Sequence, residues 1–96
     1  MIQVLKDKPA EGQPEWSVYI VRCGDDTLYT GIAKDVEQRL KKHNAGTGAA
    51  YTRTRGPVRL LYQENGFTRS GALVREAAIK RLPREKKETL ARSRKS

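Results

Sequence analysis

The segment from Val18 to Asn44, VYIVRCGDDTLYTGIAKDVEQRLKKHN, constrains the fold more than any other part of the chain. Two short runs rich in β-branched and aromatic residues lie here, SVYIVRC, which begins one residue earlier at Ser17, and TLYTGI. Between them, GDD supplies residues that tolerate the positive φ angles of a tight turn. This pattern predicts a β-hairpin.

A helix is predicted directly after the hairpin. Asp35 fits an N-cap, and Gln38 three residues later completes a capping-box pattern. The helix should run to about His43, where NAGTG breaks it, with Val36 and Leu40 on its buried side.

The second half of the chain predicts one more strand and two more helices. GTGAAYTRTRG lacks an apolar period and should be a surface loop, whereas PVRLLYQE is typical of a strand. Ser70 could cap a helix through GALVREAAIKRL, Pro83 should end or kink it, and REKKETLAR should form a third helix. The predicted fold class is therefore α+β, a small three-stranded sheet covered by helices in the order β-β-α-β-α-α.

The 96 residues suffice for one domain with a modest core. Residues 1–15 mix charge with proline and glycine and should form a flexible lead-in. We expect the folded domain to span 16–91 and a basic C-terminal tail to span 92–96.

The net charge of +9 is concentrated near the C-terminus. Residues 67–96 contain ten basic and three acidic side chains, against eight and five in residues 16–66. Such an excess favours binding to a polyanion, nucleic acid above all. The alternative is a basic helix face that only keeps the protein soluble.

Cysteine usage and hydropathy argue against an exported or membrane protein. Cys23 is the single cysteine, and no Cys/His cluster has the spacing of a zinc site. The longest apolar run, VYIV, is far shorter than the roughly 20 residues of a membrane span. We therefore expect a cytoplasmic protein without a membrane partner.

Glu76 is anomalous, because Leu73 and Ile79 place it within or beside the apolar stripe of its helix. An unpaired buried carboxylate costs several kcal/mol, so Glu76 needs a partner. That partner could be a basic side chain such as Arg39, Arg75 or Lys80, or it could be a metal ion.

Arg39 and His43 lie one helical turn apart and should project side by side along the edge of the Val36/Leu40 stripe. They could form part of a site. Alternatively, His43 could simply be a cation at the helix C-terminus, favoured by the helix dipole.

Tyr19 and Tyr29 are ten residues apart across the predicted turn. They share a sheet face if Cys23 pairs with Tyr29 and Val21 with Gly31, as a hairpin loop with an odd number of residues allows. Gly31 would then leave room beside Tyr29 for a ligand or another backbone. The alternative is that both are ordinary strand aromatics.

Together these residues follow the order and spacing of a known family. VYI at 18–20 and YTG at 29–31, then Arg39, His43 and Glu76, resemble the GIY-YIG nuclease family over Trp16 to about Leu90. The chain is most similar to the short stand-alone bacterial branch, related to the nuclease subunit of structure-selective endonucleases. It differs from the motif in having Val18 and Thr30 where the family has Gly and Ile.

The resemblance implies a DNA endonuclease that hydrolyses phosphodiester bonds by water attack, with Mg²⁺ or Mn²⁺ held by Glu76. Arg39 would stabilise charge on the phosphate, and a tyrosine activated by the metal, Lys34 or His43 would orient or deprotonate the water. Tyr19 is slightly favoured as this base and Tyr29 as the phosphate ligand. Similarity to this stand-alone branch is also compatible with three further properties. They are a role in DNA repair, selectivity for particular DNA structures and a protein partner that directs the nuclease to its target.

Further basic and aromatic residues could contact the nucleic acid outside this centre. They are Lys34, Tyr51, Arg53, Arg55, Arg75 and Lys80. The main alternative is a nucleic-acid-binding module with the same fold and little or no activity without a partner. A protein-interaction module with a basic face is a third hypothesis.

Overall fold

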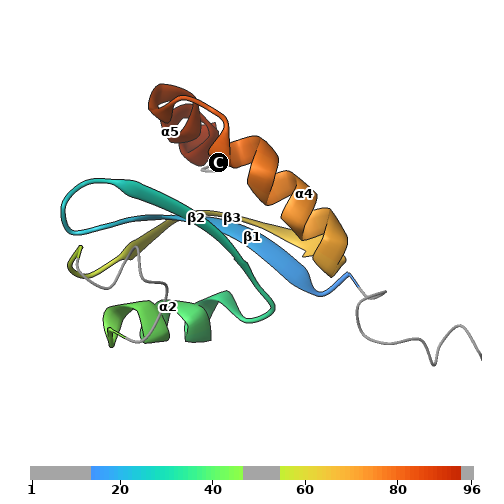
Figure 1. The fold of residues 1–96 in the computed structure, drawn as a ribbon, viewed down its shortest axis with the longest axis horizontal. Coiled ribbons are helices and arrows are strands. Elements are labelled where there is room, and N and C mark those ends of the chain that lie inside the picture. Colours follow the sequence, from blue (N-terminus) through green and yellow to red (C-terminus); the bar gives the residue numbers. More distant parts are fainter. Residues whose placement is uncertain (1–13, 47–54, 94–96) are drawn as a thin grey trace, which may run out of the picture.

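Three antiparallel strands form one sheet in the order β2-β1-β3, with β1 in the centre (Figure 1). The computed structural model describes residues 14–46 and 55–93. The strands are β1 (Trp16–Arg22), β2 (Leu28–Ala33) and β3 (Arg59–Phe67), and the helices are α2 (Val36–Asn44), α4 (Arg69–Lys80) and α5 (Arg84–Ser93). The predicted order β-β-α-β-α-α and the α+β class are confirmed.

Helices cover both faces of this sheet. Helix α2 lies on one side, and α4 and α5 lie on the other (Figure 1). Because side chains alternate along β1, Tyr19 and Val21 face α2, while Val18 and Ile20 join the cluster that contains Ala72 and Ile79 of α4. The central strand therefore contributes to two separate apolar clusters.

The hairpin has a three-residue loop, Gly24–Asp26, closed by a 2.8 Å hydrogen bond from the Cys23 amide to the Thr27 carbonyl. Asp26 takes the positive φ of 71° that the turn needs. The predicted register was wrong by two residues, since Val21 pairs with Tyr29 and Tyr19 with Gly31. A shift of two residues preserves the face of every side chain, so the predicted shared face of Tyr19 and Tyr29 is confirmed.

The first helix is capped as its sequence predicts, and its last turn is anchored by hydrogen bonds that were not predicted. Asp35 is the N-cap, and its side chain accepts a 3.1 Å hydrogen bond from the Gln38 amide. At the other end, the Asn44 side chain accepts from the Val58 amide at 2.6 Å and donates to the Val58 carbonyl at 3.3 Å. These bonds tie the last turn of α2 to the segment that leads into β3.

Two predicted boundaries were wrong. The third strand begins and ends later than PVRLLYQE, and α4 is capped by Thr68, not Ser70. Thr68 is extended and its hydroxyl accepts from the Gly71 amide, whereas Ser70 already lies inside the helix. As predicted, Pro83 separates α4 from α5.

The ends of the domain remain predictions. Of the predicted lead-in the structure describes only residues 14 and 15, and α5 includes Arg92 and Ser93, the first residues of the predicted tail. Among the described residues, no helix is both long and apolar enough to span a membrane.

Candidate active site

Tyr19 and His43 meet beneath the sheet, on the side covered by α2. The Tyr19 hydroxyl and His43 Nε2 share a 3.0 Å hydrogen bond. Both residues are almost fully buried, with 1% and 2% of their surface exposed. Tyr19 comes from strand β1 of the hairpin, and His43 comes from the last turn of α2. The bond therefore connects the hairpin to the helix that follows it in the chain.

Tyr29 completes an aromatic group around the imidazole. Its ring centroid lies 5.5 Å from that of His43, and the Tyr19 centroid lies 6.1 Å from it, both with the rings edge-on at 67°. Tyr29 is only half-buried. The three side chains predicted from the motif therefore converge on one place, with Tyr29 as the more accessible tyrosine.

Gly31 makes this convergence sterically feasible. A Cβ at Gly31 would lie 2.6 Å from the Tyr19 hydroxyl, 2.8 Å from Tyr19 Cζ and 3.1 Å from Tyr29 Cε2. The prediction that Gly31 leaves room for a ligand or another backbone was wrong, because the end of the Tyr19 ring occupies that space. Gly31 is the strand partner of Tyr19, and the absence of a side chain there lets the Tyr19 ring pass over it to reach His43.

Gly31→Ala should therefore destabilise the fold by about 1–3 kcal/mol, since a Cβ less than 3 Å from the end of the buried Tyr19 side chain forces that ring to shift. The same change should weaken the Tyr19–His43 hydrogen bond. Chemical denaturation would measure the free energy of unfolding. Gly71→Ala is the matched control, because its nearest atom lies at 3.2 Å and alanine favours a helix. Equal stability of the two variants would contradict this packing argument.

Burial and neighbouring charges determine the protonation states at this place. The pKa of Tyr19 is raised, mainly by burial, against the opposing effect of a hydrogen bond with Arg39. The pKa of His43 is lowered from 6.5, first by burial and then by the Arg39 guanidinium. His43 is therefore neutral at neutral pH, which contradicts the alternative of a helix-terminal cation.

The lowered pKa of His43 predicts a pH-dependent stability. Below 6.5 the unfolded chain binds a proton that the folded protein excludes, so the free energy of unfolding falls by up to about 1.4 kcal/mol per pH unit. His43 is the only histidine, and the lowered carboxyl pKa values of Asp25, Asp26 and Glu88 matter only in more acidic solution.

Thermal melting at pH 7.5 and 5.5 would test this prediction. The parent protein should melt at a lower temperature at pH 5.5, and His43→Gln should remove most of the difference between the two values. An unchanged difference in the variant would mean that another group is responsible.

Glu76 lies on α4 at the border of its buried side. The side chain is 17% exposed, and Oε2 pairs with Lys80 Nζ at 3.4 Å, so one of the predicted cation partners is present. The predicted stripe was partly wrong, since Leu73 is 40% exposed and the buried residues of α4 are Ala72 and Ile79. Glu76 is close enough to Tyr19 to contribute to the raised pKa of that phenol.

The structure offers one carboxylate as a metal ligand here. Among residues 14–46 and 55–93 no group of three or more His, Cys, Asp or Glu side chains is gathered in one place. Mg²⁺ is commonly held by one or two carboxylates, with water and substrate phosphate completing its shell. A half-buried Glu76 whose Lys80 partner is 53% exposed fits that mode of binding.

The predicted nucleic-acid contacts differ in their surroundings. Arg75 is held by Glu64 through bonds of 2.8 and 2.7 Å, which raise the pKa of its guanidinium. Arg55 pairs with Asp25 at 2.9 Å. Sequence reasoning missed both carboxylate partners, because neither lies at helical or strand spacing from its arginine.

The remaining predicted contacts are two lysines and two residues without a described position. Lys34 is exposed and pairs with Glu15 at 3.6 Å, and Lys80 pairs with Glu76. Tyr51 and Arg53 lie outside the described residues. Binding of nucleic acid by any of these six residues stays a prediction.

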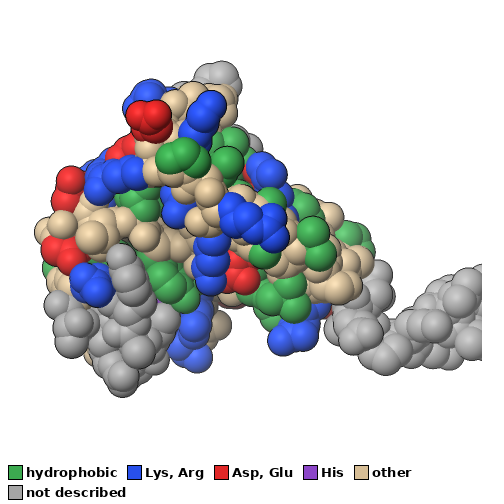
Figure 2. Space-filling view, turned by 45° about the horizontal axis from the view of Figure 1, so that its top comes forward, with side chains coloured by type: hydrophobic (Ala, Val, Ile, Leu, Met, Phe, Trp, Pro, Cys, Tyr) green, Lys and Arg blue, Asp and Glu red, His purple; other side chains and the backbone are tan. Residues whose placement is uncertain are grey.

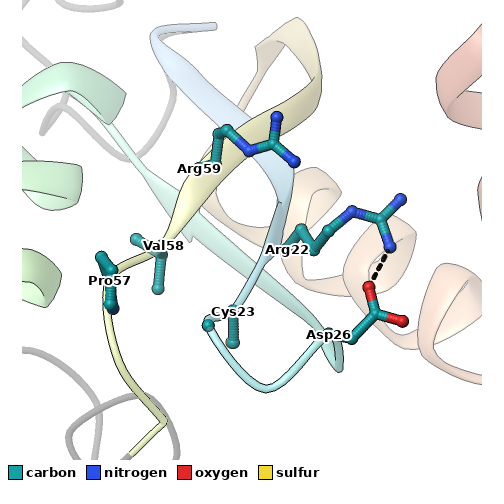
Figure 3. Close-up of a pocket in the computed structure, with 7 residues that line it drawn as sticks. Arg22, Cys23, Asp26, Pro57, Val58 and Arg59 are labelled. Atoms are coloured by element: carbon teal, nitrogen blue, oxygen red, sulfur yellow. Dashed lines mark hydrogen bonds and ion pairs between the residues drawn. The ribbon is translucent and has the colours of Figure 1, made fainter.

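A hollow of about 370 Å³ near the hairpin turn contains none of the predicted site residues (Figure 3). Arg22 and Arg59 are strand partners on its rim, beside Cys23 and Pro57. Arg22 is neutralised by Asp26 at 2.8 Å and Glu88 at 2.9 Å. These ion pairs connect the hairpin to α5 and give the hollow a structural role.

Comparison with known proteins agrees with the motif. The family model for the GIY-YIG catalytic domain matches residues 15–89. A UPF0213 protein of Haloquadratum walsbyi is 58% identical over 74 residues, covering 77% of this chain and 83% of the relative. One from Staphylococcus aureus is 56% identical over 77 residues, covering 80% and 94%.

Two solution NMR structures share the fold. A UPF0213 protein of Bacillus halodurans aligns with a TM-score of 0.53 and 43% identity, over 82% of this chain and 84% of that chain. A protein of E. faecalis aligns with a TM-score of 0.55 and 42% identity, over 80% and 82%.

Proposed function

Because the chain belongs to the GIY-YIG family, among short proteins of the UPF0213 type, we propose that it is a nuclease that hydrolyses DNA phosphodiester bonds by water attack. The observation that carries the proposal is the convergence of Tyr19, Arg39 and His43. A phenol, a guanidinium and a neutral imidazole meet there, while Glu76 acts electrostatically on the same phenol.

Tyr19 and His43 would together remove the proton of the attacking water. With its pKa raised, Tyr19 is a protonated phenol at neutral pH, so it cannot act as a base alone. It can accept a proton from water only while passing its own proton to His43 Nε2, 3.0 Å away. His43 can receive that proton because it is neutral.

Arg39 and Tyr29 would bind the phosphate. The Arg39 guanidinium interacts with the Tyr19 phenol and can stabilise charge that grows on the non-bridging oxygens. Tyr29 presents a half-buried phenol beside the same imidazole and can donate a hydrogen bond to the phosphate.

Glu76 would hold one divalent ion, Mg²⁺ or Mn²⁺. Such an ion supplies polarisation of the phosphate and stabilisation of the leaving oxygen. Glu76 contributes the negative charge that attracts the ion, and Lys80 would move aside, which its exposed side chain permits.

The surface charge supports DNA as the substrate. Lys and Arg side chains are spread over the visible face from its top to its lower edge, with fewer acidic side chains among them (Figure 2). We extend the proposal to a preference for branched or flapped DNA, a role in DNA repair in the cytoplasm and a targeting protein partner.

Incubation of the pure protein with linear, flapped and branched DNA, with Mg²⁺, Mn²⁺ or EDTA, tests the proposal. Cleavage that requires the metal supports it. The second candidate is a DNA-binding module of the same fold, favoured by the exposed basic charge. Tight binding without cleavage of any substrate in either metal would support this module and contradict the nuclease.

A further inference from the structure

Two cations lie around the indole of Trp16, the first residue of β1. This is the end of β1 opposite the hairpin turn. Lys34 Nζ and Arg69 Cζ each lie 5.7 Å from the ring centroid, within the range of a cation–π contact. Lys34 directly follows β2 and Arg69 is the first residue of α4. The ends of three elements therefore meet at what we call the Trp16 cluster, which consists of Trp16, Lys34 and Arg69.

This cluster holds more positive charge than its surroundings neutralise. The two cations are at most about twice 5.7 Å apart, so they repel each other. Lys34 has a long, exposed pair with Glu15 at 3.6 Å, while no carboxylate of the described residues pairs with Arg69. An anion placed near the ring would relieve the repulsion.

Arg69 is also unfavourable for the helix that it begins. A cation in the first turn opposes the helix dipole, and the first turn of α4 contains no acidic residue to compensate. The cation–π contact with Trp16 offsets this cost, and an anion bound at the same place would offset it further.

The Trp16 cluster is continuous with the candidate active site. Lys34 lines a shallow pocket of about 190 Å³ together with Arg39 and Lys42. Trp16 packs against the Val18 and Ile20 cluster on the α4 face of the sheet, whereas Tyr19 faces α2. The Trp16 cluster and the site are therefore linked through Lys34, which follows the edge strand β2.

We propose that the Trp16 cluster binds a backbone phosphate of the DNA strand, separate from the phosphate that is cut. This inference rests on the proposed function for the identity of the polyanion. Lys34 and Arg69 supply the charge, and the indole holds both cations in place. The interaction reads the backbone and not the bases, so it is independent of sequence.

Trp16 is the only tryptophan, so its fluorescence reports directly on the cluster. A linear DNA duplex, labelled for anisotropy, is titrated in EDTA to prevent cleavage. We expect a saturable change in Trp16 emission that follows the anisotropy curve. Binding without any change in emission would overturn the proposal.

The double variant Lys34→Gln/Arg69→Gln supplies the second measurement. It should bind at least fivefold more weakly at low salt, and its slope of log K against log salt should be less steep by about 0.9 for each lost phosphate contact. Lys41→Gln/Arg59→Gln is the matched control, since it also removes one lysine and one arginine from exposed positions, here on α2 and β3. Both double variants should melt within a few degrees of the parent.

The two proposals can fail separately. Equal affinities and slopes for the two double variants would contradict the Trp16 subsite and leave metal-dependent cleavage untouched. A Trp16 response with the expected loss of affinity, in a protein that cuts no DNA, would support the subsite and contradict the nuclease.

Discussion

Replacing Glu76 with glutamine should reduce the rate of DNA cleavage at least about a thousandfold while the melting temperature stays nearly constant. A bound metal ion contributes several kcal/mol to the transition state, and the neutral amide would no longer attract it. DNA binding in EDTA should persist or improve, because one negative charge near the phosphate disappears.

If Glu76 only neutralised Lys80, Glu76→Gln would leave the rate of DNA cleavage near the parental value, again with little change in melting temperature. Removing one partner of a buried pair usually costs 3–5 kcal/mol, but Lys80 is 53% exposed and such pairs contribute little. Glu64→Gln provides the contrast, because Glu64 is 19% exposed and binds Arg75 through two bonds.

Thermal melting, DNA titration in EDTA and a cleavage time course on the same preparation would separate these possibilities. Glu64→Gln should lower the melting temperature clearly, whereas Glu76→Gln should not. A Glu76→Gln protein that melts far below the parent, or that cuts DNA at the parental rate, would show that Glu76 is not the metal ligand.

Tyr19→Phe should reduce cleavage by about 10²- to 10⁴-fold, the usual contribution of a positioned general base. The variant keeps the ring that packs over Gly31 and loses only the hydroxyl that bonds to His43. We expect a loss of stability of about 1–3 kcal/mol, since a buried hydrogen bond is removed.

Tyr29→Phe is the matched control for the assignment of the base. If Tyr29 only binds the phosphate, this variant should bind DNA more weakly and lose less of its single-turnover rate than Tyr19→Phe. Cleavage would be followed with enzyme in excess over DNA, so that binding and chemistry are measured separately. A larger loss of rate in Tyr29→Phe would mean that the half-buried tyrosine is the base.

Local patterns in the sequence predicted most of the fold. The hairpin, the Asp35 cap, the end of α4 before Pro83 and the element order all depend on residues close together in the chain, and they are confirmed. The shared face of Tyr19 and Tyr29 was also predictable, because side chains alternate with a period of two. The cap of α4 was wrong because Thr68 and Ser70 have similar propensities, and only the backbone conformation distinguishes them.

The sequence by itself determined which chemical groups are available and that Tyr19 and Tyr29 lie on one face of the hairpin. Only the tertiary structure decided their partners. It placed Tyr19 over Gly31 and against His43, and it paired Arg75 with Glu64. These outcomes depend on distances between residues on different elements, and periodicity carries no information about such distances. The same reason explains the Trp16 cluster, in which Lys34 and Arg69 come from opposite halves of the chain and meet only where β2 ends and α4 begins.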